Sequence, residues 1–259
     1  MSFILLFRAW NALFAAGVCV YSFFIAGILN YGDIVLLSLG VFSLVAFANT
    51  HNDIIDFEID KINRPNRPLP SGKINLKTAN TAAFAWLFLA VILGFVAGFE
   101  FALLFTIVGA LAFIYNLYLK GLPLIGNCVV ALLTTTPVII PIIKFGWPQT
   151  ELLNLAFFAF MLTFVREVTK DIEDMEGDKV RGLKTFPILL GIKTSLTLIF
   201  ICKFQILAQL VLFKPTLLIG IAPCLALSVL FALLKKWRLS QITLKITMLA
   251  GLVFFYITL

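Results

Sequence analysis

The chain of 259 residues is far too apolar for a soluble globular protein. Hydrophobic residues make up 61% of it, charged residues only 13%, and the mean hydropathy is +1.06, whereas soluble domains carry about 25% charged residues. The formal net charge of +7 is best explained by cationic loops that orient the chain against anionic membrane lipids. The composition therefore predicts an integral membrane protein, and it indicates neither a nucleic-acid partner nor a protein partner.

Apolar runs of about 20 residues recur along the chain, and each is long enough to cross about 30 Å of hydrocarbon as a helix. We predict nine transmembrane helices, over residues 9–29, 33–53, 77–97, 99–117, 123–143, 152–173, 194–213, 216–234 and 241–258. This arrangement places most loop cations on one side of the membrane and only Lys144 and Lys214 on the other. By the positive-inside rule, the amino terminus and the long charged segments are cytoplasmic and the carboxyl terminus is outside.

The second predicted span turns polar at its cytoplasmic end. Asn52, Asp56 and Asp60 follow one another at intervals of four residues, so we expect them to project from one helical face. Like charges at that spacing weaken a helix. A positive group is therefore needed to compensate them.

The sixth predicted span repeats this arrangement in Asp174 and Asp178. A constant offset of 118 residues pairs five identical residues: Asp53 with Asp171, Asp56 with Asp174, Glu58 with Glu176, Asp60 with Asp178, and Lys61 with Lys179. We predict a single domain over residues 1–259 with an internal repeat, in which about 33–72 is echoed by about 151–190. Repeats of this kind place equivalent sites opposite each other in membrane folds.

The acidic clusters indicate a metal site more strongly than two solvated helix ends, because ionisable residues continuous with a membrane span are costly and usually functional. The atoms of these clusters that could bind a metal are all oxygens, which suits Mg²⁺. In proteins, Mg²⁺ usually bridges carboxylates and a substrate phosphate. Nearby basic residues suit that phosphate: Arg64, Arg67, Arg166, Lys170, Lys179, Arg181 and Lys184. For Arg166 and Lys170 the simpler alternative is ion pairing with Glu167 or Asp174.

These motifs resemble those of the UbiA superfamily of intramembrane prenyltransferases. Its N-x-x-x-D-x-x-x-D motif matches Asn52, Asp56 and Asp60, and its second D-x-x-x-D motif matches Asp174 and Asp178. The segments "FRAWN", "NRPNRPLPSG" and "YNLYLKGLPLIGN" also resemble the family. The resemblance implies an all-α bundle of nine transmembrane helices around a central cavity. It also implies that these five residues hold two Mg²⁺ ions, which bind the diphosphate of a polyprenyl donor.

The resemblance implies roles for further residues. Asp53 and Asp171 are additional ligands or hydrogen-bond acceptors behind the ligands. Tyr115 or Tyr118 donates to the leaving group or faces the developing cation, unless both are only interfacial tyrosines. The residues expected to contact the diphosphate are Arg64, Arg67, Lys120 and Lys170, and those expected to bind an acceptor phosphate are Arg8, Arg181 and Lys184.

Within the superfamily, the text "REVTKDIEDMEGDKVRGLKTFPI" is most similar to archaeal digeranylgeranylglyceryl phosphate synthases. This implies transfer of a geranylgeranyl group from its diphosphate to the glycerol hydroxyl of geranylgeranylglyceryl phosphate, a lipid-like phosphorylated acceptor, among membrane lipids. The nearer alternative is an aromatic-ring prenyltransferase of quinone synthesis. The more distant one is a secondary transporter, which would place its ion sites near the bilayer midplane.

Overall fold

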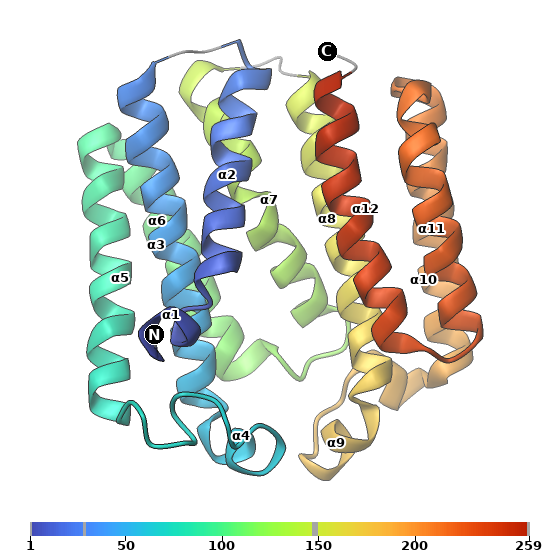
Figure 1. Ribbon diagram of the computed structural model, residues 1–259, viewed down its shortest axis with the longest axis horizontal. Helices are drawn as coiled ribbons and strands as arrows, with labels where there is room; N and C mark the ends of the chain where they lie inside the picture. The colour runs from blue at the N-terminus through green and yellow to red at the C-terminus, as the bar shows by residue number, and fades with distance from the viewer. Residues whose placement is uncertain (1, 28–29, 147–149, 258–259) are drawn as a thin grey trace. The chain divides into compact units, whose positions relative to one another are not determined.

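The computed structural model describes residues 2–27, 30–146 and 150–257, and within these ranges the side chains of Asn63 and of 254–257 are not described. Every regular element in the described ranges is a helix (Figure 1). The prediction of an all-α fold is therefore confirmed. Long apolar runs form these helices because a helix satisfies all of its backbone hydrogen bonds internally, which hydrocarbon requires.

The first half of the described chain contains α1 (Ser2–Leu6), α2 (Ala9–Ile25), α3 (Tyr31–Ile55), α4 (Phe57–Asn63), α5 (Leu76–Ala97) and α6 (Phe99–Ile114). A single π-helical turn, η1 (Tyr115–Leu119), continues α6. The second half contains α7 (Ile125–Phe145), α8 (Thr150–Glu173), α9 (Met175–Val180), α10 (Phe186–Phe213), the 3₁₀ turn η2 (Pro215–Leu217), α11 (Leu218–Leu233) and α12 (Trp237–Ile257).

Seven segments of the described chain are long and apolar enough to cross a membrane. They are α3, α5, α6 with η1, α7, α8, α10, and η2 with α11. The predicted number of nine is therefore too high by this criterion. The first predicted span corresponds to α2, which has only 17 residues, fewer than the ~20 that a spanning helix needs. The ninth, 241–258, extends into residues that lie outside the described side chains.

The chain divides into two compact units. The first consists of Met1–Tyr118 and Thr136–Leu153, and the second of Leu119–Thr135 and Asn154–Leu259. In the first unit, α3 packs against α2, α5 and α6 around fully buried side chains that include Phe23, Phe101 and Phe105. Gly40 of α3 faces the ring of Phe105 so closely that a Cβ atom there would overlap it.

Hydroxyl groups connect the helices of the second unit. The Ser240 hydroxyl of α12 donates to the carbonyl oxygen of Ser228 on α11 at 2.8 Å. The buried ammonium of Lys203 on α10 donates to the Ser228 hydroxyl at 2.6 Å. These contacts hold α10, α11 and α12 together, because few polar partners compete for them inside an apolar helix layer.

Each unit carries its acidic motif on a long helix that breaks and continues as a short one. Asp56 separates α3 from α4 with φ −81° and ψ 5°, and Asp174 separates α8 from α9 with φ −87° and ψ 0°. The two breaks fall at positions that the 118-residue offset aligns. The expected helical face through Asn52, Asp56 and Asp60 is interrupted at its middle aspartate, although the N–H of Asp56 still donates to the Asn52 carbonyl oxygen at 2.9 Å and the N–H of Asp60 to that of Asp56 at 2.8 Å. Repulsion between carboxylates spaced four apart favours such a break.

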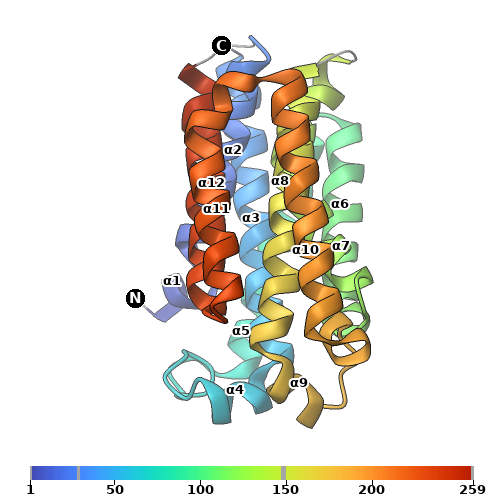
Figure 2. The same ribbon diagram turned by 90° about the vertical axis from the view of Figure 1, so that its right-hand side faces the viewer.

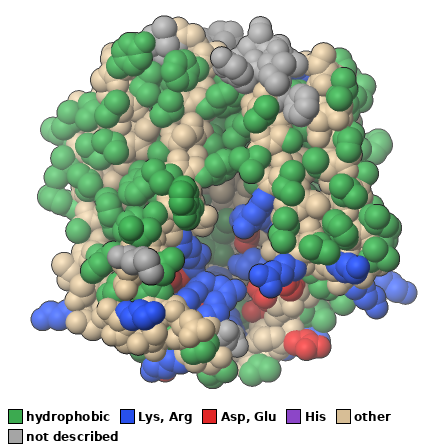
Figure 3. Space-filling model, viewed as in Figure 1, with side chains coloured by type: hydrophobic (Ala, Val, Ile, Leu, Met, Phe, Trp, Pro, Cys, Tyr) green, Lys and Arg blue, Asp and Glu red, His purple; other side chains and the backbone are tan. Residues whose placement is uncertain are grey.

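Charged side chains gather where the short helices lie. On the face shown in Figure 3, Lys, Arg, Asp and Glu are concentrated toward α4 in the first unit and toward α9 in the second, whereas hydrophobic side chains cover most of the remaining helix surface. Figures 1 and 2 show α1 beside the same end of α3 that carries α4. There Leu6 of α1 is buried with Leu69 and Ile74 of the segment after α4.

Candidate active site

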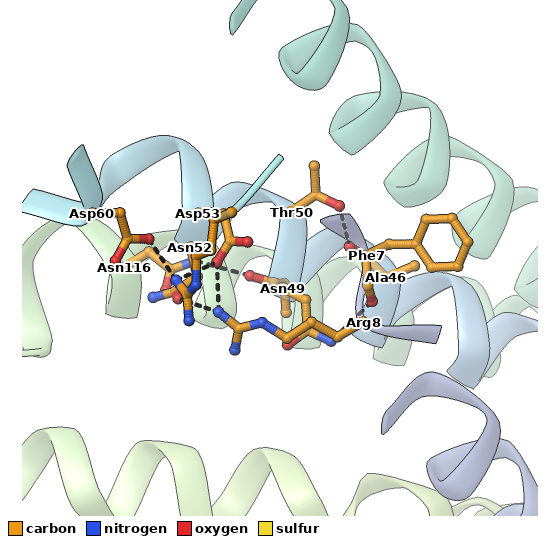
Figure 4. A network of polar contacts seen from close by, with 11 residues as sticks. Phe7, Arg8, Ala46, Asn49, Thr50, Asn52, Asp53, Asp60 and Asn116 are labelled. Atoms are coloured by element: carbon orange, nitrogen blue, oxygen red, sulfur yellow. Dashed lines mark hydrogen bonds and ion pairs between the residues drawn. The ribbon is translucent and has the colours of Figure 1, made fainter. Parts of the chain in front are cut away.

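The last turn of α3 holds a buried carboxylate between two arginines. Oδ1 of Asp53 accepts from Nη2 of Arg8 at 2.5 Å and from Nη1 of Arg67 at 3.1 Å, and the Asp53 side chain is only 5% exposed. The same Arg67 nitrogen donates to Oδ2 of Asp60 at 2.5 Å. Figure 4 shows the side chains of Arg8, Asp53 and Asp60 within this polar network. Arg67 therefore joins the acid of α3 to the acid of α4 across the break at Asp56.

Arg8 reaches this site from a strained position. It lies between α1 and α2 in the left-handed region, with φ 50° and ψ 60°, which costs an L-residue about 1–2 kcal/mol. Its guanidinium lies 3.3 Å from Oδ1 of Asn52 as well as contacting Asp53. Burial of Leu6 two residues earlier and the ion pair with Asp53 offset the strain.

A chain of polar side chains continues from Asn52 to the end of α6. Nδ2 of Asn52 lies 3.4 Å from Oδ1 of Asn116, and Nδ2 of Asn116 lies 3.0 Å from Nδ1 of His51. The His51 ring stacks between Phe47 and Phe113, with centroids 5.6 and 4.6 Å away. Asn116 belongs to the π turn η1, a feature common at functional sites. Our sequence analysis missed Asn116, although a buried amide at the end of an apolar run was a usable signal.

The arginines expected to bind phosphate in the first unit lie around one pocket of about 450 Å³. Its lining consists of Leu5, Arg8, Asp53, Arg64, Pro65, Asn66, Arg67 and Pro68. The sequence assigned Arg8 to one phosphate and Arg64 and Arg67 to another, whereas the structure brings all three to the same pocket. Of the two expected tyrosines, both in η1, Tyr118 is 71% exposed.

In the second unit, Asp171 is held in a comparable way. Its Oδ2 accepts from Nδ2 of Asn127 at 2.8 Å, and Asn127 lies in the first turn of α7. The aspartates that the 118-residue offset aligns, Asp53 and Asp171, thus each accept from a polar side chain at the start of the preceding long helix. Asn127 was another residue that the sequence analysis did not assign.

The cations of α8 pair with Glu167. Its carboxylate lies 2.5 Å from Nη2 of Arg166 and 3.8 Å from Nζ of Lys170, so both cations make the ion pair with Glu167 that the sequence analysis considered. The Lys120 ammonium also acts electrostatically on Glu167. Lys120 is followed by Gly121, whose carbonyl oxygen accepts from the backbone N–H of Lys184 at 3.2 Å. The loop after η1 is therefore joined to the loop after α9.

The second acidic motif is partly buried. Asp178 of α9 is 8% exposed, and burial together with the neighbouring Asp174 carboxylate raises its pKa, while the Arg181, Lys170 and Lys120 cations oppose that rise. These groups belong to the predicted metal-binding and phosphate-binding sets.

The predicted metal ligands are divided between the two units. Asn52, Asp56 and Asp60 belong to the first unit, and Asp174 and Asp178 belong to the second. In the described part of the chain, no group of three or more His, Cys, Asp and Glu side chains comes together as a metal site.

The sequence profile of the UbiA prenyltransferase family matches residues 5–256. The chain belongs to this family. Over 200 residues it is 40% identical to a digeranylgeranylglyceryl phosphate synthase from Methanosphaera stadtmanae, covering 76% of this chain and 71% of the relative. A solved structure of a digeranylgeranylglyceryl phosphate synthase superposes with a TM-score of 0.77 at 28% identity, covering 100% of this chain and 98% of the other.

The UbiA fold extends to more distant relatives. A UbiA homologue from Archaeoglobus fulgidus, solved bound to DMAPP and Mg²⁺, has a TM-score of 0.67 at 18% identity and covers 99% of this chain and 100% of its own. The resemblance recognised in the sequence motifs is therefore confirmed. This UbiA-family protein is a multi-pass membrane prenyltransferase.

Proposed function

We propose that this UbiA-family protein transfers a geranylgeranyl group from geranylgeranyl diphosphate to the glycerol hydroxyl of geranylgeranylglyceryl phosphate. The observation that carries the proposal is the 40% identity to the Methanosphaera stadtmanae synthase over 76% of this chain. The superposition on a synthase structure over the whole chain also supports it. The product would be digeranylgeranylglyceryl phosphate, a lipid that remains in the membrane.

The donor atoms of the two acidic motifs fit Mg²⁺, because amide and carboxylate oxygens are the ligands that this hard cation prefers. The Mg²⁺ reported for the Archaeoglobus fulgidus homologue supports the same ion. Asn52, Asp56, Asp60, Asp174 and Asp178 would hold two ions. When bound, Mg²⁺ neutralises charge that develops on a departing diphosphate.

Asp53 and Asp171 act as acceptors behind the ligands rather than as ligands. Asp53 already accepts from Arg8 and Arg67, and Asp171 from Asn127. Asp53 thereby orients Arg67, whose other contact is Asp60. Loss of Asp53 would leave Arg67 its contact with Asp60 and Arg8 its contact with Asn52, but would remove the acceptor that the two guanidinium groups share.

The cations would act on the donor. Arg64, Arg67, Lys120 and Lys170 would contact the diphosphate, placing positive charge where the oxygens of the leaving group become negative. The allylic carbon–oxygen bond breaks with its electron pair leaving on diphosphate. The glycerol oxygen then bonds to that carbon and loses its proton to the solvent or the diphosphate.

Four further assignments complete the proposal. Tyr115 or Tyr118 would donate to the leaving group or face the cation, and Arg8, Arg181 and Lys184 are available to an acceptor phosphate. The amino terminus and the acidic motifs would be cytoplasmic and the carboxyl terminus outside. The paired breaks at Asp56 and Asp174 support an internal repeat in a single domain.

The proposal is tested by incubating the purified protein with Mg²⁺, geranylgeranyl diphosphate and an acceptor. The acceptor is either geranylgeranylglyceryl phosphate or an aromatic acid such as hydroxybenzoate or dihydroxynaphthoate. Geranylgeranylglyceryl phosphate should give a product with the mass of digeranylgeranylglyceryl phosphate, and EDTA should abolish its formation. A prenylated hydroxybenzoate or dihydroxynaphthoate in place of that product would establish the aromatic alternative. Uptake of labelled substrate into vesicles without any new product would establish a transporter.

A further inference from the structure

The buried amide of Asn116, which has no role so far, lies against α3 beside a proposed metal ligand. Its Nδ2 lies 3.4 Å from the carbonyl oxygen of Ala48 and 3.0 Å from Nδ1 of His51. Its Oδ1 lies 3.4 Å from Nδ2 of Asn52 (Figure 4). Asn116 is only 5% exposed, so protein groups rather than bulk water must satisfy its amide.

The orientation of the Asn116 amide is set by a group that can only accept. A backbone carbonyl oxygen has no hydrogen to donate, so the edge of Asn116 that faces Ala48 must be the NH₂ group. The same NH₂ group faces Nδ1 of His51, which therefore accepts and leaves the hydrogen of the ring on Nε2. The opposite edge of the amide consequently presents its oxygen to Asn52.

This orientation determines the orientation of Asn52. Because the oxygen of Asn116 accepts, Asn52 turns its Nδ2 toward it and its own Oδ1 away. On that other side, Nη2 of Arg8 lies 3.3 Å from Oδ1 of Asn52, and a guanidinium offers only donors. A flipped Asn52 amide would oppose oxygen to oxygen at Asn116 and N–H to N–H at Arg8, so both neighbours require the same arrangement.

Packed aromatic rings hold this polar chain in place. The ring of His51 stacks on Phe47 of α3 and on Phe113 of α6, and Phe47 is fully buried. Asn116 follows Phe113 by three residues, in the π turn η1 that continues α6. Both partners of the contact between His51 and Asn116 are therefore fixed by packing between α3 and α6.

We propose that Asn116 is a positioning residue that keeps the side-chain oxygen of Asn52 available to Mg²⁺, an assignment that rests on the ligand role proposed above for Asn52. The oxygen is the atom of an amide that binds a hard cation, since the nitrogen carries two hydrogens and acts only as a donor. An amide oxygen has two lone pairs, so it can accept from Arg8 and still bind a metal ion. Groups that orient a ligand from behind typically contribute about 10- to 100-fold to metal affinity.

A double-mutant cycle with Mn²⁺ as the probe tests this role, because Mn²⁺ binds the same oxygen ligands as Mg²⁺. Electron paramagnetic resonance of free Mn²⁺ gives its Kd for the purified protein in detergent, with neither donor nor acceptor added. We expect Asn116→Leu, which removes the amide at similar volume, to raise this Kd about 10- to 100-fold. Asn52→Ala should raise it at least as much, and the double variant should bind no more weakly than Asn52→Ala, because Asn116 acts through Asn52.

Two further variants separate positioning from a general loss of packing. The matched control is Thr50→Val, because Thr50 is fully buried on the same helix and its hydroxyl donates only to the carbonyl oxygen of Ala46 at 2.7 Å; its Kd should stay within about twofold of the wild type. Asn52→Asp offers oxygen at both edges, so it should restore Mn²⁺ binding to Asn116→Leu. Asn116→Ala, which adds no new atoms, takes the place of Asn116→Leu throughout if the leucine variant shows no cooperative thermal unfolding.

An unchanged Kd for Asn116→Leu would overturn the positioning role. So would losses that add in the double variant, an equal loss in Thr50→Val, or no recovery with Asn52→Asp. Wild-type protein that binds no Mn²⁺ would refute the metal site itself and this inference with it. Wild-type protein that binds Mn²⁺ but makes no digeranylgeranylglyceryl phosphate would instead refute the proposed reaction, so the two failures are distinguishable.

Discussion

Asp53→Asn removes one negative charge from the buried end of α3 while preserving the volume of the side chain. It converts two ion-paired hydrogen bonds, at 2.5 and 3.1 Å, into weaker ones in which only the guanidinium is charged. Each such bond is worth about 1.5–3 kcal/mol. The partners Arg8 and Arg67 are 32% and 20% exposed and so partly screened by solvent. Arg67 also retains Asp60. We therefore expect a net loss of about 2 kcal/mol in the free energy of unfolding.

Thermal unfolding of the detergent-solubilised protein measures this loss. For a chain of this size, about 2 kcal/mol corresponds to a fall of ~4–8 °C in Tm. Glu58→Gln is the matched control, because it makes the same chemical change in an ion pair with Lys61 whose side chains are 76% and 46% exposed. Such exposed pairs contribute little, so the control should shift Tm by no more than about 1–2 °C.

The reasoning is refuted if Asp53→Asn lowers Tm no more than Glu58→Gln does. A second measurement separates an orienting role from metal binding. If Asp53 orients Arg8 and Arg67, the variant should lose kcat while the Mg²⁺ concentration needed for half-maximal activity changes little. A large rise in that concentration would make Asp53 a metal ligand instead.

Three further predictions concern other parts of the chain. Asp56→Ala and Asp174→Ala should each abolish turnover while leaving membrane insertion and Tm near the wild type; normal product formation by both would refute their assignment as ligands. Gly40→Ala should cost about 1–3 kcal/mol in unfolding free energy because its methyl overlaps the Phe105 ring, whereas Gly17→Ala, with nothing within 4 Å, should be neutral or stabilising by up to about 1 kcal/mol; equal Tm values would contradict this. Asn127→Ala should cost about 1–3 kcal/mol by depriving Asp171 of its 2.8 Å donor, and an unchanged Tm would show that this bond contributes nothing.

The sequence by itself determined the class of the protein, because that class follows from local properties. Apolar runs such as the one in α10 predict helices wherever hydrocarbon forbids unpaired backbone groups. The spacing of Asn52, Asp56 and Asp60 identified the first acidic motif, and the 118-residue offset identified the second. Where the helices end was less accessible: α2 proved shorter than its predicted span, and the helix through the first motif broke at Asp56.

Only the tertiary structure decided which side chains meet. Arg8 and Asp53 lie 45 residues apart in the chain and Gln241 and Glu173 lie 68 apart, so no periodicity relates them. Their contacts depend on how the helices pack and on the left-handed backbone at Arg8. Pairing of this kind follows from the fit of whole helix surfaces, which local spacing does not encode.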